Sequence, residues 1–140
     1  MKLKDRIAIV TGAARGIGFA IAERFVAEGA TVIICDVEDA AGAVAAKSIG
    51  ATYLHCDVSN AADVRALVAA TVARCGAVDI LVNNAGISMV QDLLDISEAD
   101  YDRVLNVNLK GSFMMLQACA KEMVKQVKSG RKPGAIVNMS

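Results

Sequence analysis

The chain has 140 residues, the size of one domain, and its 15 basic and 15 acidic residues balance to a formal net charge of zero. This balance, without a basic patch, argues against a protein that binds nucleic acid or a membrane surface. Apolar residues make up 55% of the chain and aromatic residues only 4%. That composition favours aliphatic strands buried on both faces of a parallel sheet.

Neither the N-terminal segment nor the cysteines point to export or to a metal site. Residues 1–6 contain no long apolar run and no small-residue cleavage site, and no stretch approaches the roughly 18 apolar residues of a membrane span. The four cysteines show neither a C-x-x-C motif nor metal-ligand spacing. We therefore expect a cytoplasmic protein with reduced thiols and no bound metal.

Short apolar runs alternate with helical patterns along the first half of the chain. Strands are predicted over residues 6–12, 31–35 and 51–56. Helices are predicted over residues 16–29, 38–49 and 61–75. Asn60 is the expected N-cap of the third helix, and a glycine stands at or just after the end of each helix.

The second half continues the same alternation. A fourth strand is predicted over residues 79–82, and a loop follows from residue 87 to 96. Ser97 and Asp100 form a plausible capping box for one long helix that runs to about Val127. A turn over residues 129–134 then leads into a fifth strand over residues 135–139.

This order of elements predicts an α/β fold, a Rossmann-type doubly wound parallel sheet with five strands and helices on both faces. The sequence contains no repeat and no linker between domains. The last strand is apolar and is followed only by Ser140, although a central strand needs partners on both edges. We therefore expect residues 1–140 to form one domain whose C-terminal part is missing.

A glycine-rich turn over residues 11–18 connects the first strand to the first helix. Backbone N–H groups at a helix start are unpaired, and the helix dipole adds partial positive charge there. Gly12, Gly16 and Gly18 lack the Cβ that would keep a phosphate away. The turn is therefore a predicted phosphate site, and the simpler alternative is an ordinary strand-to-helix connection.

Asp36 strengthens the phosphate interpretation, because it lies 18 positions after Gly18 at the end of the second strand. Dinucleotide-binding units place a ribose-binding carboxylate there. A 2′-phosphate about 4 Å from this charge would cost about 4 kcal/mol at an effective dielectric near 20, which favours NAD over NADP. Arg15 acts in the opposite direction, and Asp36 could instead cap a helix starting at Val37.

Two further polar strand ends are expected at the same edge of the sheet. Asp57 ends the third strand and is a candidate adenine contact, or alternatively a cap before residues 58–60. The fourth strand runs into Asn83-Asn84-Ala85-Gly86. The two amides can tie neighbouring strand ends together, and the small residues after them can admit a ligand to the backbone. Both roles stay open.

The long helix carries an asparagine on its apolar side. Asn108 falls on one stripe with Val104, Ser112 and Met115, which we expect to face inward. A buried asparagine needs partners or a function. A solvated polar stripe is expected at Asp102, Asn106 and Lys110. Gly111 in mid-helix costs roughly 1 kcal/mol relative to alanine, so close packing is expected to require it.

Together these motifs resemble the first part of a single-domain short-chain dehydrogenase/reductase. The resemblance covers the whole chain. It rests on residues 11–18, Asp57, residues 83–86, residues 106–111 and residues 134–140. It implies NAD(P)-linked oxidation or reduction of an alcohol or carbonyl, a small-molecule alcohol or ketone substrate, and a homo-oligomer, either dimer or tetramer.

The resemblance also assigns roles to single residues. It implies that Asp36 selects NAD, that Asp57 contacts adenine, and that Asn83, Ala85 and Gly86 lie near the cofactor ribose. It makes Asn108 the active-site asparagine, whose main chain holds a water of the proton relay. The predicted cofactor-binding set is Gly12, Arg15, Gly16, Ile17, Gly18, Asp36, Asp57, Val58, Asn83, Ala85 and Gly86.

The chain departs from the family pattern at its end. Members of the family use a serine followed by a Y-x-x-x-K pair, and neither Tyr53 nor Tyr101 begins such a motif. Ser140 corresponds to the first of two serines, of which the second is catalytic. The chain is therefore predicted to carry the NAD-binding half of an enzyme that interconverts a secondary alcohol and a ketone, and to be inactive alone. The alternative is a non-catalytic nucleotide-binding module.

Overall fold

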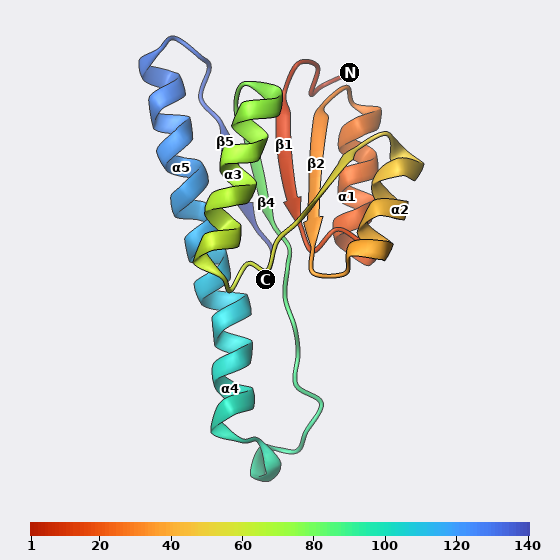
Figure 1. The fold of residues 1–140 in the computed structure, drawn as a ribbon, viewed down its shortest axis with the longest axis vertical. Coiled ribbons are helices and arrows are strands. Elements are labelled where there is room, and N and C mark those ends of the chain that lie inside the picture. The colour runs from red at the N-terminus through yellow and green to blue at the C-terminus, as the bar shows by residue number, and fades with distance from the viewer.

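The computed structural model describes residues 1–140 and shows a five-stranded parallel sheet between two layers of helices (Figure 1). The strands are β1 (Ile7–Thr11), β2 (Thr31–Asp36), β3 (Thr52–His55), β4 (Ile80–Asn83) and β5 (Ala135–Asn138). Their order in the sheet is β3-β2-β1-β4-β5, and every neighbouring pair is parallel. The predicted Rossmann-type α/β fold is confirmed, and the order of strands reverses between β1 and β4.

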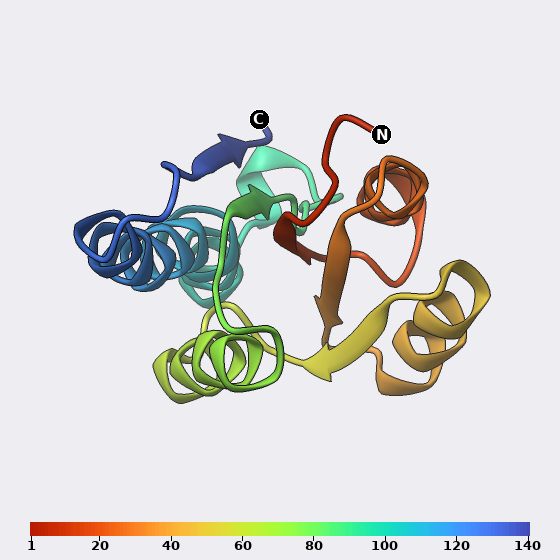
Figure 2. The same ribbon diagram turned by 90° about the horizontal axis from the view of Figure 1, so that it is seen from above.

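The helices divide between the two faces of the sheet. Figure 2 shows α1 (Gly16–Ala27) and α2 (Asp39–Ile49) on one side, and α3 (Ala61–Cys75) and α5 (Ser112–Lys128) on the other. Between β4 and α5 the chain forms a short 3-10 turn η1 (Leu93–Asp95), helix α4 (Glu98–Leu105) and a π-helical turn η2 (Asn106–Gly111). In Figure 1, α4 extends beyond the carboxyl edge of the sheet.

Alternate strand residues supply the two halves of the core. Ile9, Ile33 and Leu81 pack toward α3 and α5. Val10, Ile34 and Val82 pack on the opposite face, toward α1 and α2. All six are at most 1% exposed, and full burial of such a side chain contributes about 1.5–3 kcal/mol. The aliphatic composition therefore reflects a sheet covered on both faces, as expected.

The predicted single long helix is interrupted by the π-helical turn η2. Gly111 ends this turn and is buried against Val58, where an added Cβ would lie 2.7 Å from Val58 Cγ2. The prediction that close packing requires Gly111 is confirmed. A π turn contains one residue more per turn than an α-helix, so it rotates the residues on either side of it relative to each other.

Asp79 joins three segments at the amino edge of the sheet. Its carboxylate is fully buried and accepts two hydrogen bonds of 2.7 Å from Arg131, in the turn before β5. The Ile7 N–H donates to the same carboxylate at 2.9 Å, and Arg6 Nη1 lies 3.6 Å from it. The predicted fourth strand therefore starts at Ile80, one residue later than expected, because Asp79 forms this joint.

No helix is both long and apolar enough to cross a membrane. Cys35 and Cys56 are buried in the core. No cluster of three or more histidine, cysteine or acidic side chains is arranged to bind a metal ion.

Candidate cofactor site

The glycine turn between β1 and α1 depends on all three of its glycines. Gly12 and Gly16 have positive φ angles of 63° and 61°. An added Cβ at Gly12 would lie 2.7 Å from the Cα of Ala85, and one at Gly18 would lie 2.6 Å from the Gly12 carbonyl oxygen. Around Gly16, by contrast, no atom lies within 4 Å of an added Cβ. Gly12 and Gly18 are therefore required by packing. Gly16 is favoured by its positive φ angle and faces open space.

The first turn of α1 offers unpaired donors beside this open space. Arg15 is the N-cap but makes no side-chain capping bond, and the first helical hydrogen bond runs from Phe19 N to Arg15 O at 3.3 Å. The N–H groups of Gly16, Ile17 and Gly18 thus have no helical partner. Ile17 is 65% exposed. An anion here would gain about 0.3–1 kcal/mol from the helix dipole in addition to its hydrogen bonds.

Asp36 links the glycine turn to the loop that follows β2. Its Oδ2 accepts a hydrogen bond of 3.1 Å from Ala14 N, and its Oδ1 accepts from Val37 N at 2.8 Å and Glu38 N at 3.2 Å. Helix α2 starts only at Asp39, with Glu38 as its N-cap. The alternative of Asp36 as a cap for a helix starting at Val37 is therefore wrong. The carboxylate is half-buried and fixed against the turn.

An ion pair between Arg15 and Glu38 spans the same gap. Both side chains are exposed. A free Arg15 cation would favour NADP over NAD, because it could attract the 2′-phosphate of NADP. In the structure this cation is paired with a carboxylate of the facing loop.

Asp57 and Val58 face different surroundings. Asp57 Oδ1 accepts hydrogen bonds from Ser59 N at 2.9 Å and Ser59 Oγ at 2.6 Å, so it stabilises the turn before α3. Asn60 caps α3 as predicted. The Val58 side chain is buried in the core against Gly111, so only the main chain of Val58 is available for a ligand in the crevice.

The two asparagines after β4 tie strand ends together, which was one of the two roles expected. Asn83 is 4% exposed, and its Nδ2 donates to Ser112 O at 3.2 Å and to Asn138 Oδ1 at 2.9 Å. Asn84 Nδ2 donates at 3.1 Å to the carbonyl oxygens of both Thr11 and Gly12. These bonds join β4 to β5 and to the glycine turn, while Gly86 lies exposed after them.

Thr11 has a role at this edge that the sequence analysis missed. Its side chain is 1% exposed, and its Oγ1 accepts hydrogen bonds from Asn84 N at 3.1 Å and Ala85 N at 3.0 Å. The signal was a hydroxyl residue at the end of an otherwise apolar strand, because a buried hydroxyl requires partners.

Asn108 lies in the π-helical turn, and its side chain does not face inward as expected. It is exposed, with Oδ1 accepting from Ile87 N and Nδ2 donating to Ile87 O, both at 2.8 Å. Of the other expected inward residues, Met115 is fully buried, whereas Val104 and Ser112 are half-buried. The predicted polar stripe is exposed at Asp102, Asn106 and Lys110. The π turn rotates Asn108 away from the core, toward the loop after Gly86.

Two buried cysteine thiols have the properties of core groups rather than nucleophiles. Contact with the Cys56 thiol, together with burial, raises the pKa of the Cys35 thiol well above its usual value. Burial raises the pKa of the Cys119 thiol to about 12. Both thiols are therefore protonated at neutral pH.

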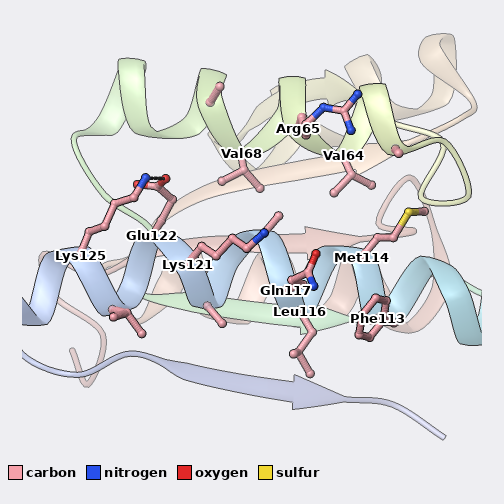
Figure 3. A pocket seen from close by; sticks show the side chains of 15 residues that line it. Val64, Arg65, Val68, Phe113, Met114, Leu116, Gln117, Lys121, Glu122 and Lys125 are labelled. Atoms are coloured by element: carbon pink, nitrogen blue, oxygen red, sulfur yellow. Dashed lines mark hydrogen bonds and ion pairs between the residues drawn. The ribbon is translucent and has the colours of Figure 1, made fainter.

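A separate groove of about 810 Å³ runs between α3 and α5 (Figure 3). Its apolar lining includes Val64, Val68, Phe113, Met114 and Leu116. Arg65, Gln117 and Lys121 contribute polar groups. Neither the glycine turn nor Asp36 lines this groove, so it is distinct from the candidate cofactor site.

Comparison with known proteins agrees with this geometry. A family model described as short chain dehydrogenase matches residues 6–140. The chain is 40% identical to galactitol 2-dehydrogenase of Agrobacterium fabrum and 39% identical to sorbitol dehydrogenase of Cereibacter sphaeroides, each alignment covering 100% of this chain and 54% of the relative. It is 44% identical to an uncharacterized oxidoreductase of Mycobacterium bovis, over 99% of this chain and 56% of that protein.

The chain thus spans about half the length of the curated relatives it matches. Within that half, the match includes the glycine turn, the acidic strand ends and the asparagine turn after β4. The sheet order and the family model lead to the same conclusion: the chain belongs to the short-chain dehydrogenase/reductase family of oxidoreductases.

Proposed function

We propose that residues 1–140 form the NAD(H)-binding part of an oxidoreductase that interconverts a secondary alcohol and a ketone by hydride transfer. The observation that carries the proposal is the Asp36 carboxylate, which is fixed 3.1 Å from Ala14 N beside the unpaired start of α1. Ligands of open α/β sheets bind at the carboxyl edge, where the strand order reverses. In this sheet that position lies between β1 and β4.

The residues at this edge fit the adenosine and pyrophosphate parts of such a cofactor. The N–H groups of Gly16, Ile17 and Gly18 would hold the pyrophosphate, and the open space at Gly16 leaves room for it. Asp36 would accept hydrogen bonds from the adenosine ribose. Asp57 and the main chain of Val58 would contact the adenine ring.

The asparagine turn would shape the opposite end of the crevice. Ala85 and exposed Gly86 would present their main chain to the second ribose, while Asn83 positions the strand end behind them. Asn108 is the proposed catalytic residue in this half. The main-chain carbonyl oxygen of Asn108 accepts a hydrogen bond from Ser112 Oγ at 2.9 Å and would also hold a water for proton transfer. The nicotinamide, when bound, supplies the hydride acceptor or donor.

The preference for NAD over NADP is part of the proposal. A 2′-phosphate at the ribose position would meet the negative charge of Asp36. Arg15 would be the natural counter-charge, but in the structure it is paired with the Glu38 carboxylate. Both observations support NAD as the cofactor.

The substrate class rests on the relatives and not on this half of the site. Galactitol and sorbitol, for which two relatives are named, are sugar alcohols that contain secondary hydroxyl groups. This supports a secondary alcohol as the substrate of the whole protein. Since residues 1–140 contain no Y-x-x-x-K motif, we expect these residues alone to bind the cofactor without turnover, as a non-catalytic module also would.

The assembly and the location of the whole protein are proposals as well. We propose a homo-oligomer, dimer or tetramer, that uses the exposed side of α5. In support, Phe113 and Val124 on that helix are 57% and 55% exposed. Sedimentation of the protein at two concentrations tests this, and a monomer at both would contradict it. A cytoplasmic location is consistent with four free cysteines, of which three are buried.

Titration of the chain with NADH, monitored by the fluorescence of NADH, tests the cofactor proposal. Gly16→Ala and Gly50→Ala form a matched pair, because both glycines have positive φ and open space around an added Cβ. Both substitutions should lower stability by about 1 kcal/mol. Only Gly16→Ala should also weaken NADH binding, because only Gly16 faces the proposed pyrophosphate. Equal binding by the two variants, or none by the unmodified chain, would overturn the proposal.

A further inference from the structure

His55, the sole histidine of the chain, joins two helices that lie on opposite faces of the sheet. It is the last residue of β3. Its Nδ1 lies 2.7 Å from Asp39 Oδ1 on α2, and its Nε2 lies 3.6 Å from Asp63 Oδ2 on α3. One imidazole therefore bridges two carboxylates from different elements.

Each of these carboxylates is connected in turn to a strand end of the proposed cofactor site. The Tyr53 hydroxyl lies 2.7 Å from Asp39 Oδ1 and 2.8 Å from the carbonyl oxygen of Asp36. On the other side, Asp63 Oδ2 accepts a hydrogen bond of 3.0 Å from Asp57 N. A chain of polar contacts thus runs from the main chain of Asp36, through His55, to the main chain of Asp57. Its contact between His55 and Asp63 is an ion pair at 3.6 Å rather than a hydrogen bond. The single Tyr53 proton is donated to one of its two acceptors at a time.

We propose that His55 is a positioning residue for the adenosine half of the site: its protonated imidazole, bridging Asp39 and Asp63, fixes the distance between the strand ends that carry Asp36 and Asp57. This inference rests on the proposed function, because it assigns the ribose to Asp36 and the adenine to Asp57. His55 itself would touch neither group.

The charge of the imidazole decides whether the bridge is complete. A protonated imidazole donates from both ring nitrogens, whereas the neutral ring donates from only one. The charged groups around His55 are Asp39 on α2, Asp57 in the turn before α3 and Asp63 in the first turn of α3. Tyr53, on β3, shares the Asp39 Oδ1 atom with His55. All are acidic or neutral, so they favour the protonated form.

The titration of His55 follows from these neighbours. The hydrogen bond with Asp39 raises the pKa of His55, burial opposes the rise, and the charges of Asp39, Asp63 and Asp57 add to it. A raised pKa means that the bridge is complete below the unfolded value of about 6.5 and is lost as the pH rises through the folded value. Cofactor affinity should therefore decrease with rising pH over that interval.

A purely structural role of His55 would not make adenosine binding depend on pH. The His55 side chain is 50% exposed, and exposed ion pairs add little to folding stability. Replacing His55 should thus leave the thermal midpoint nearly unchanged. The pH dependence of adenosine binding, in contrast, should disappear.

The sole histidine makes the test direct, because its ring protons titrate without overlap in a proton NMR spectrum. Their shifts are followed from pH 5 to 9 without ligand, with 5′-AMP, and with nicotinamide mononucleotide, which lacks the adenosine half. We expect 5′-AMP to raise the His55 pKa by about 0.5. The affinity for 5′-AMP should correspondingly be about threefold lower at pH values where His55 is neutral than where it is protonated. Nicotinamide mononucleotide should leave the pKa unchanged.

Two variants separate the steps of the network. His55→Gln should abolish the pH dependence of 5′-AMP binding, and Tyr53→Phe should preserve the titration of the histidine but reduce its response to 5′-AMP. If 5′-AMP binds with no change in the His55 pKa, the inference is wrong and the proposed function stands. If neither 5′-AMP nor NAD binds, both are wrong. The NMR experiment uses the unmodified protein, so the result does not depend on the folding of a variant.

Discussion

Asn84 donates two hydrogen bonds to Thr11, one from its main chain to the Thr11 side chain and one from its side chain to the Thr11 main chain. Asn84 N donates to Thr11 Oγ1 and Asn84 Nδ2 donates to the Thr11 carbonyl oxygen, both at 3.1 Å. Thr11 ends β1, and Asn84 directly follows β4. Because the strand order reverses between these strands, the pair fixes the width of the crevice where ligands bind in open α/β sheets.

Thr11→Val removes the hydroxyl acceptor of this connection with little change in side-chain volume and leaves the bond to the Thr11 carbonyl oxygen in place. The N–H groups of Asn84 and Ala85 then lose their acceptor, and an unsatisfied buried donor costs about 1–3 kcal/mol. We expect urea denaturation to show a loss of roughly 2 kcal/mol. Thr71→Val is the control, since Thr71 is equally buried but only donates to Leu67 O within α3. Equal losses in the two variants would contradict the role of Thr11.

Features that depend on local patterns were predictable from the sequence. The alternation of apolar runs and helical patterns predicted all five strands and the doubly wound order. The caps at Asn60 and Ser97 were predicted for the same reason, since a capping residue acts on N–H groups two or three positions away. Each predicted strand end lies within one residue of the observed end.

Features that depend on packing between distant segments were not. The π-helical turn arises where Gly111 meets Val58, 53 positions earlier, so helical periodicity alone placed Asn108 on the wrong side. The joint of Asp79 with Arg131 and the bridge of His55 to Asp39 likewise connect residues far apart in the sequence. A contact between two single residues that are distant in the sequence leaves no periodic pattern from which it could be predicted.

Glu38→Gln should weaken the discrimination against NADP. Without its partner carboxylate, the Arg15 guanidinium becomes available to a 2′-phosphate. The exposed pair is worth roughly 0.2–1 kcal/mol, so NADP affinity should rise by up to about fivefold. Calorimetric titration with NADP and NAD measures the ratio, and NAD affinity should stay constant. In the double variant Arg15→Ala/Glu38→Gln the gain should vanish; if it persists, Arg15 is not its source.

Arg131→Met should strongly destabilise the fold at neutral pH. It leaves the buried Asp79 carboxylate without its main partner, a change that typically costs about 3–5 kcal/mol. Lys132→Met is the matched control, because Lys132 is the exposed basic neighbour. Urea denaturation at pH 7 should therefore separate the two variants by several kcal/mol, and similar midpoints would refute the role of the joint.

The pH dependence of this joint provides a second measurement. Burial disfavours the charged form of Asp79, but hydrogen bonds from Arg131 and Ile7 N–H outweigh it and lower the pKa of Asp79 below its usual value. A lowered pKa contributes stability that is present above the unfolded value of about 3.9 and lost as the pH falls through the folded value. The difference in free energy of unfolding between the unmodified protein and Arg131→Met should therefore become smaller at acidic pH. A deficit that does not change with pH would indicate lost packing instead.

Asn108→Ala should release the loop after Gly86 from the π-helical turn. Both side-chain hydrogen bonds of Asn108 end on the main chain of Ile87. Without them, the amides around Ile87 should exchange with deuterium at least tenfold faster, because a modest 1.4 kcal/mol of local stability corresponds to that factor. Asn106→Ala is the control, since Asn106 lies two positions earlier, is exposed and makes no side-chain hydrogen bond.

The same pair of variants separates anchoring of the loop from a general effect on the helix. If the loop helps to shape the crevice beside Gly86, NADH binding should weaken in Asn108→Ala and not in Asn106→Ala. Faster exchange with unchanged NADH affinity would mean that the Asn108 side chain fixes the loop without contributing to the cofactor site. In that case only the carbonyl of Asn108, which neither substitution removes, could still take part in proton transfer. Unchanged exchange in both variants would show that the two bonds to Ile87 do not anchor the loop.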